Sequence, residues 1–476
     1  MKERQIRLLA DSLKAPTIAG LVAGIGLLIS IAAMMNQAVP ARLFPPQSVT
    51  FTQNNTDYQG LVFDRVINLS DSTGIFIPNT PGLSVSGNNV YVAWREGSVN
   101  PGPDIFFRAS NDSGNAFSDP IRLGTRASIL FTPQIATIEK FVYVAWEGTV
   151  PVSDSYNFQV FLRVSNDYGA TFGETLNISE STAEAREPQI AAEGKNVYIV
   201  WQDNTPRNND IFLRTSSDYG ATFGKGVNLS SNNGDSNSPR LTISDARLFI
   251  IWSDHSYGNS DILLTKIIHG KSFSGNTINL SRDKKVSTNP QMTLTDQYIY
   301  VIWESHEFPA PTLSAPIRDI MFRSSSDNGV SFNSPSRLSA NVIDSVGPNI
   351  AAAGENVYVV WASSNPNGFP NIFFRKSIDG GESFDNTLNL QNDLTDHMSP
   401  EIVATGQIVY ITWDNAGTAY NQSFVIIYDS ANVFVSNVTF ESEPKSIISS
   451  SMAVTGDDIY LAWDVNDEIY LAAAKI

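Results

Sequence analysis

Short apolar runs alternate with polar turns through most of the chain, most clearly in the stretch from Pro188 to Phe223. Apolar residues follow Pro188, the run VYIVW ends at Trp201, and a third run, IFLR, ends at Arg214. Runs of this length that are rich in β-branched and aromatic residues are typical of strands. The turn SSDYGATF follows, in which short polar side chains can bond nearby amides and glycine can take a positive φ. The stretch therefore predicts three strands and a tight turn.

The same unit recurs along the chain, and every tryptophan marks one copy of it. The eight tryptophans are Trp94, Trp146, Trp201, Trp252, Trp303, Trp361, Trp413 and Trp463. Successive tryptophans are 52, 55, 51, 51, 58, 52 and 50 residues apart, and a proline stands thirteen residues before seven of them. A period near fifty lies in the range of propeller blades. The repeat therefore predicts one domain built as a β-propeller.

The two ends of the repeat complement each other. The segment LVFDRVINLS, from Leu61 to Ser70, resembles the sequence that follows the third strand in later units, such as GVNLS and TINLS. The eighth unit stops after its third strand, at Ile476. A strand from the N-terminus would complete the last blade and leave no free sheet edge. We therefore predict an all-β, eight-bladed propeller of four-stranded blades over residues 61–476, with the ring closed by the N-terminal strand.

One apolar segment precedes the repeats. Residues 15–35 carry no charge and are long enough to cross a bilayer. Basic residues outnumber acidic ones in residues 1–14, which predicts a cytoplasmic tail, a single transmembrane anchor and an extracellular propeller. Residues 36–60, with three prolines, are predicted to be a tether. A cleaved signal peptide is the alternative, although its apolar region is usually shorter.

The turn pattern S-x-D-x-G-x-x-F resembles the Asp box, or BNR repeat, of sialidase-like propellers. Five copies are intact, and they begin at Ser110, Ser165, Ser216, Ser325 and Ser377. In that family the boxes are structural and lie away from the ligand face. A sialidase-like activity would imply three arginines that hold a carboxylate, a tyrosine nucleophile with a glutamate, and an acidic residue for proton transfer. Here the arginines before the boxes and most tyrosines occupy repeated positions, which favours a packing role.

Polar residues follow the proline that opens most first strands. They are Gln134, Gln189, Arg240, Gln291, Asn349 and Glu401. Because first strands line the axis of a propeller, these six residues are the candidate binding residues. A solvated lining of the axis without a ligand is the alternative.

Acidic residues stand one or two places after seven of the tryptophans, and two histidines stand three places after neighbouring tryptophans. The repeat would place the two histidines side by side, near several carboxylates. Together they form a set of nitrogen and oxygen donors suited to a divalent metal. This candidate metal set is Asp254, His255, Glu304, His306 and Glu307. The repeated acids are otherwise explained as hydrogen-bond acceptors that cap loops.

Composition narrows the choice of partner. The net charge of −17 argues against nucleic acid, and the absence of cysteine excludes disulfides and thiolate metal sites. We expect a membrane-anchored binding or scaffold module that recognises a carbohydrate or a surface protein. A sialidase-like glycoside hydrolase, with acids such as Asp254 and Glu304 in proton transfer, is the first alternative, and a structural protein of the cell envelope is the second. A divalent metal is the one cofactor that the sequence suggests.

Overall fold

The computed structural model describes most of the chain after residue 48. The described residues are 49–53, 62–70, 80–97, 103–124, 133–152, 155–256, 258–268, 277–307, 317–340, 343–364, 370–390, 397–406, 408–415, 423–428, 432–440, 447–456, 458–465 and 468–475. The chain divides into two compact units, Met1–Gln47 and Ser48–Ile476. Among the described residues, no helix is long and apolar enough to cross a membrane. The predicted anchor, residues 15–35, lies outside them.

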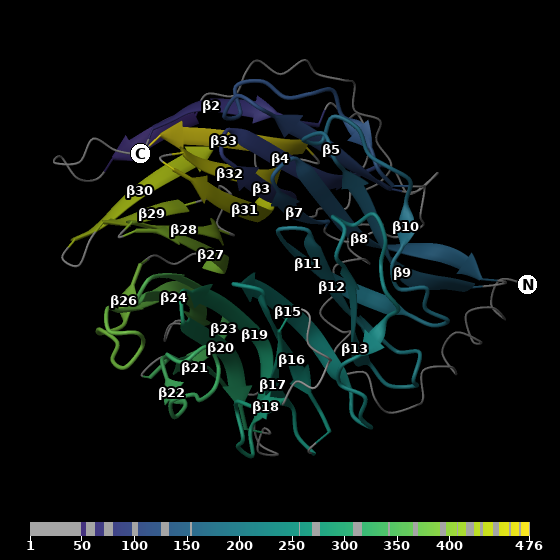
Figure 1. The fold of residues 1–476 in the computed structure, drawn as a ribbon. Helices are drawn as coiled ribbons and strands as arrows, with labels where there is room; N and C mark the ends of the chain where they lie inside the picture. Colours follow the sequence, from purple (N-terminus) through teal and green to yellow (C-terminus); the bar gives the residue numbers. More distant parts are fainter. Residues whose placement is uncertain are drawn as a thin grey trace, which may run out of the picture. The chain divides into compact units, whose positions relative to one another are not determined.

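Strands form antiparallel sheets that follow the sequence repeat (Figure 1). The first strands are β3 (Gly82–Ser86), β7 (Gln134–Ile138), β11 (Ala185–Glu193), β15 (Ser236–Ser244), β19 (Val286–Thr295), β23 (Ile343–Ala353), β27 (His397–Thr405) and β31 (Ile447–Thr455). The second strands are β4 (Asn89–Glu96), β8 (Phe141–Val152), β12 (Asn196–Asp203), β16 (Arg247–Asp254), β20 (Tyr298–His306), β24 (Asn356–Ser364), β28 (Ile408–Asn415) and β32 (Asp458–Val465).

The outer half of each sheet holds the remaining strands. The third strands are β5 (Asp104–Ser110), β9 (Ser155–Ser165), β13 (Asp210–Ser216), β17 (Asp261–Ile268), β21 (Arg318–Ser325), β25 (Pro370–Ser377), β29 (Ser423–Tyr428) and β33 (Glu468–Lys475). The fourth strands are β6 (Ile121–Arg122), β10 (Leu176–Asn177), β14 (Val227–Asn228), β18 (Ile278–Asn279), β22 (Ser336–Arg337), β26 (Leu388–Asn389), β30 (Asn432–Phe440) and β2 (Val62–Asn68).

The prediction of eight four-stranded blades is wrong for one blade, because the structure has seven four-stranded blades. Seven sheets have four strands, and the remaining sheet, which starts at β27, has five because β1 (Val49–Gln53) pairs with its outer strand β30. The fourth strands of the first six sheets have two residues each, whereas β30 has nine. A long outer strand exposes a row of unpaired backbone groups, and β1 covers that edge. The strand β1 lies within the segment that we predicted to be a tether.

The predicted closure by the N-terminal strand is confirmed. β2 pairs antiparallel with β33, the last strand of the chain, in the order β2-β33-β32-β31. Each first strand contacts the first strands of the sheets on either side, and the series ends with β31 against β3. Across this closure, Ser451 Oγ donates to the carbonyl of Pro81 at 2.7 Å. The first strands therefore surround the centre of the propeller (Figure 1).

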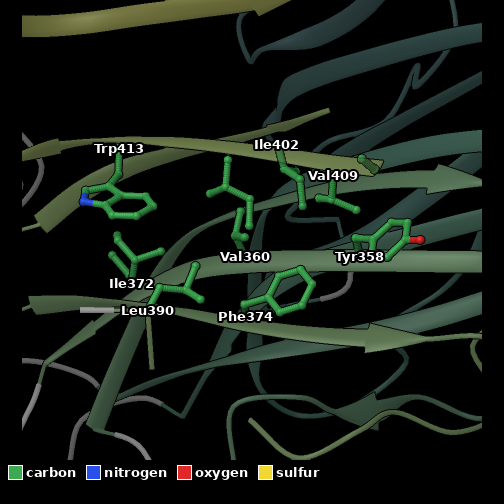
Figure 2. Close-up of a cluster of buried hydrophobic side chains, with 11 residues drawn as sticks. Tyr358, Val360, Ile372, Phe374, Leu390, Ile402, Val409 and Trp413 are labelled. Atoms are coloured by element: carbon green, nitrogen blue, oxygen red, sulfur yellow. The ribbon is translucent and has the colours of Figure 1, made fainter. Parts of the chain in front are cut away.

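Hydrophobic cores lie between neighbouring sheets. Figure 2 shows one of them, in which Val360 and Phe374 of the β23 sheet meet Ile402 and Trp413 of the β27 sheet. All eight tryptophans are almost completely buried, which explains why they recur once per blade. Burying large aromatic side chains contributes strongly to stability, about 2 to 3 kcal/mol for each.

The five S-x-D-x-G-x-x-F turns share one hydrogen-bond pattern. In each turn the serine Oγ donates to the aspartate at 2.6–2.8 Å and accepts the glycine N–H at 2.8–2.9 Å. The glycine is required in these turns: at Gly381, φ is +84° and a Cβ would lie 2.4 Å from the Phe322 ring.

The repeated arginines pack the blades together, as the sequence indicated. Arg323 donates to the carbonyl of Leu280 in the preceding blade at 2.8 Å, and Arg108, Arg214 and Arg375 make the equivalent bonds to Leu69, Ile178 and Leu338. These four guanidinium groups therefore connect the outer part of their blades to the preceding blade.

Candidate functional site

The six predicted binding residues occupy one register position of the first strands. Each pairs with the residue directly before a tryptophan, as Gln189 does with Val200 and Arg240 with Ile251. The other pairs are Gln134 with Ala145, Gln291 with Ile302, Asn349 with Val360 and Glu401 with Thr412. All six therefore lie at the same level of the strands that surround the centre. That they bind a ligand stays a prediction.

These six side chains differ in their hydrogen bonds. Asn349 Oδ1 accepts the N–H of Ile350 at 2.8 Å, and Glu401 Oε2 accepts the N–H of Met452 in the next blade at 3.1 Å. Arg240 Nη1 donates only to the carbonyl of Pro239, at 3.0 Å, among the residues that the structure describes.

The remaining three of the six, Gln134, Gln189 and Gln291, make no side-chain hydrogen bond to the described part of the chain. Together with Arg240 they come from four consecutive first strands, β7, β11, β15 and β19 (Figure 1). We call Gln134, Gln189, Arg240 and Gln291 the arc. Its amide and guanidinium groups are available to hydrogen-bond a ligand.

Two of the six residues, Glu401 and Arg240, have shifted pKa values. Burial raises the pKa of Glu401 to about 8. The hydrogen bond from the N–H of Met452 lowers this pKa, whereas the charge of Asp414 raises it further. At neutral pH most of the Glu401 carboxyl is therefore neutral. Burial lowers the pKa of the Arg240 guanidinium, and the charge of Glu187 opposes that effect. Because an arginine stays protonated, Arg240 brings a positive charge to the arc.

A β-bulge precedes the register position in each of five consecutive blades. The residue before the proline has a positive φ at Glu187, Ser238, Asn289, Gly347 and Ser399. The ladder shifts there, for example between Arg186 and Gln189. A non-glycine residue in this conformation costs about 1 to 3 kcal/mol, and it persists only where its surroundings hold it.

In three cases, the residue directly after a tryptophan holds the bulge of the next blade. Glu147 accepts the N–H of Glu187 at 3.0 Å, Gln202 accepts that of Ser238 at 3.2 Å, and Glu304 accepts that of Gly347 at 2.9 Å. All three acceptor side chains are buried. These contacts could not be predicted from the sequence, because they join residues about forty positions apart and require the positive φ.

The acids two places after a tryptophan have a different role. Glu96, Asp203 and Asp254 accept the indole N–H of Trp94, Trp201 and Trp252 at 2.7, 3.1 and 3.1 Å. These acids are therefore hydrogen-bond acceptors that fix the tryptophans and the adjoining loops. This agrees with the capping interpretation of the repeated acids.

The structure does not gather the predicted metal set into a site. Among the described residues, no group of three or more His, Cys, Asp or Glu side chains is arranged to hold a metal ion. Asp254 is completely buried, and hydrogen bonds from the protein occupy both its oxygens.

The other members of the metal set face different partners. Glu304 accepts bonds from Asn289 and Gly347, and the His255 ring contacts the Asp235 carbonyl. His306 lies beside Arg318, and burial together with that charge lowers its pKa. Glu307 is exposed and lies 3.9 Å from Lys285.

A cluster of charged side chains with no signal in the sequence adjoins the segment that leads into Gln189. Glu147 faces Arg186 at 3.4 Å, and Arg186 also pairs with Glu184 at 3.2 Å and covers the Phe158 ring. Burial raises the pKa of Glu147 to about 7, although the N–H of Glu187 and the charge of Arg186 work against it. A carboxyl with this pKa exchanges its proton near neutral pH.

Two of the repeated tyrosines make structural contacts between blades. Tyr143 and Tyr300 are buried, burial raises the pKa of both hydroxyls, and they donate to the carbonyls of Tyr219 and Gly354 in neighbouring blades. A nucleophilic tyrosine needs a lowered pKa or an adjacent base, so these two hydroxyls are unsuited to that role.

No family model and no curated protein matches the chain. Several solved structures resemble it. The polysaccharide lyase Uly1 matches with a TM-score of 0.49 and 10% identity, over 83% of this chain and 98% of its own. The α-L-arabinofuranosidase Arb93A from Fusarium graminearum matches with 0.38 and 13%, over 62% and 92%. The intramolecular trans-sialidase from Ruminococcus gnavus matches with 0.39 and 10%, over 79% and 98%. These low values assign no activity to this chain.

Proposed function

We propose that the protein is a carbohydrate-binding propeller whose ligand contacts the arc at the centre of the ring. The observation that supports this proposal is that four consecutive blades present three glutamine amides without a side-chain hydrogen bond to the described residues, and one guanidinium that bonds only to the carbonyl of Pro239 there. Sugar hydroxyls both donate and accept hydrogen bonds, and so does the amide of glutamine. In the neighbouring positions, Asn349 and Glu401 already bond to backbone N–H groups. The arc side chains therefore have donors and acceptors that a ligand can bind, whereas the side chains of Asn349 and Glu401 already bond to the protein.

Substitutions in the arc are expected to weaken glycan binding at least tenfold. Gln189→Ala removes both a donor and an acceptor, and Arg240→Gln removes the positive charge, so each lost contact should cost about 1.4 kcal/mol or more. The measurement is the affinity of the full chain, in detergent, for a panel of neutral and acidic oligosaccharides. Tyr168→Ala is the matched control, because this exposed side chain lies in a turn between third and fourth strands. Equal affinities for arc and control variants would contradict the proposal.

A glycan-processing enzyme is the second candidate, and the environment of Glu147 favours it. A general acid or base works best with a pKa near the working pH, and burial places the pKa of Glu147 at about 7. Incubation of the same oligosaccharides with the full chain separates the two functions, since only an enzyme yields shortened products. A surface-protein ligand or a purely structural role would leave the whole panel unbound.

We also propose that the five serine–aspartate turns are Asp boxes and that the chain is related to sialidase-like propellers. The shared hydrogen bonds and the positive φ of the turn glycines support this relationship. The arginines before the turns bond to backbone carbonyls of the neighbouring blade, so they are unsuited to holding a ligand carboxylate.

Membrane anchorage through residues 15–35 is part of the proposal, with the propeller outside. An uncharged stretch of that length supports it. After membranes that carry the full chain are washed with alkaline carbonate, the protein is expected to stay in the pellet. Release of the whole protein into the supernatant would show that the segment does not anchor it.

A further inference from the structure

The segment that leads into each arc residue is held from the neighbouring blade. In the β11 blade, Glu187 has φ +54° and stands two residues before Gln189. In the β15 blade, Ser238 has φ +55° and stands two residues before Arg240. Proline follows in both cases, and the residue before a proline normally prefers an extended conformation. An external hydrogen bond is therefore needed to fix the direction in which the first strand starts.

Glu147 and Gln202 provide that bond, and they do so from equivalent positions. Each directly follows a tryptophan, and each accepts the N–H of the residue with positive φ, at 3.0 and 3.2 Å. The position after the tryptophan is thus a carboxylate where it bonds to the segment that leads into Gln189. It is a neutral amide where it bonds to the segment that leads into Arg240. We infer that Glu147 is a positioning residue for Gln189 and that it makes ligand binding by the arc depend on pH. This inference rests on the proposed function of the arc.

The surroundings of Glu147 explain the direction of the effect. Arg186 faces it at 3.4 Å, while the charges of Glu184 and Glu187 oppose its ionisation. Burial, helped by the charges of Glu187 and Glu184, raises the pKa of Glu147 to about 7, although the N–H of Glu187 and the charge of Arg186 lower it. The ionised carboxylate binds Arg186 and the Glu187 N–H more strongly than the neutral carboxyl does, since charged acceptors make stronger hydrogen bonds. Gln189 is therefore held more firmly at pH 8 than at pH 6.

The test begins without a ligand. Hydrogen exchange of the peptide that contains Glu187 is measured on the full chain at pH 6 and pH 8, after correction for the intrinsic exchange rate. The wild-type protein is expected to lose about fivefold in protection at pH 6, whereas Glu147→Gln is expected to show equal protection at both pH values. Glutamine is the natural residue at the equivalent position, Gln202, so this variant keeps the acceptor and removes the titration. Glu304→Gln is the control, because Glu304 makes the same bond to Gly347, ahead of Asn349 rather than an arc residue.

Binding provides the second readout. For any oligosaccharide of the panel that binds, the affinity of the wild-type protein should rise up to about tenfold from pH 6 to pH 8. Glu147→Gln should flatten this profile, and Glu304→Gln should leave it unchanged. If no oligosaccharide binds, the proposed function fails while the exchange result still decides the role of Glu147. Exchange in the wild-type protein that does not change with pH, or changes equally in Glu147→Gln, would overturn the inference.

Discussion

Deletion of residues 1–70 is expected to prevent the propeller from folding. The deletion removes β2, which completes the last sheet beside β33. Leu69 is almost completely buried in the core between this sheet and the β3 sheet, where it packs with Trp94 and Tyr460. The backbone of Leu69 also bonds to Ile469 at 2.7 Å, and its carbonyl accepts Arg108 at 3.0 Å. Losing a strand at the closure should cost more than about 5 kcal/mol, comparable to the stability of a whole domain.

The measurement is the yield of soluble protein and the presence of a cooperative thermal transition. Deletion of residues 1–47 is the control, because the propeller unit begins at Ser48 and this shorter deletion keeps β1 and β2. We expect the control to fold normally. A deletion of residues 1–60 removes β1 but keeps β2, and it should expose the edge of β30 without opening the ring. A normal transition in the protein that lacks residues 1–70 would show that the closing strand is dispensable.

The sequence predicted the blades because each one depends on large residues at fixed positions. A tryptophan in every second strand must be buried between sheets, so the eight tryptophans reveal the repeat directly. The end of the repeat also revealed the closure, since the last unit lacks a strand that the N-terminus supplies. The fifth strand of the β27 sheet, β1, was not predicted. Val49–Gln53 lies outside the fifty-residue repeat and pairs with a strand almost four hundred residues away.

The candidate site was predictable in position but not in partners. The proline that precedes Gln189 and Arg240 identified the start of the first strands, and the register confirmed that these residues share one position. The partners of a side chain depend on the adjoining blade, as the bond from Glu187 to Glu147 shows. For the same reason, Asp254 resembled a metal ligand in the sequence, whereas the structure surrounds it with donors from its own blade and from Asn232.

Replacement of Asp254 by alanine is expected to destabilise the propeller by about 3 to 5 kcal/mol. One of its oxygens accepts bonds from Asn232, Ser236 and Trp252 at 2.7, 2.9 and 3.1 Å, and the other accepts the N–H of Ser256 at 2.9 Å. Burial works to raise the pKa of Asp254, but these bonds outweigh it, so the pKa is lowered and the buried group stays ionised. Alanine would leave the indole and hydroxyl donors buried without an acceptor.

The measurement is the free energy of unfolding in guanidinium chloride, with Asp254→Asn as the matched variant. Asparagine keeps the size and one carbonyl oxygen, so it should cost less than alanine. A metal ligand would behave differently, because its replacement would matter only when the metal is present. An unchanged midpoint for Asp254→Ala would show that the hydrogen bonds to this carboxylate do not stabilise the fold.

The neighbouring blade offers the reverse experiment. Ser305 stands two places after Trp303, as Asp254 does after Trp252, and Ser287 lies opposite Ser305 as Ser236 lies opposite Asp254. Among the described residues, Trp303 Nε1 and the Ser287 hydroxyl have no hydrogen-bond partner. Ser305→Asp should provide the missing acceptor and raise the free energy of unfolding by about 1 kcal/mol. A loss from Asp254→Ala together with a gain from Ser305→Asp would establish that the carboxylate acts within the repeat as a support for the tryptophan.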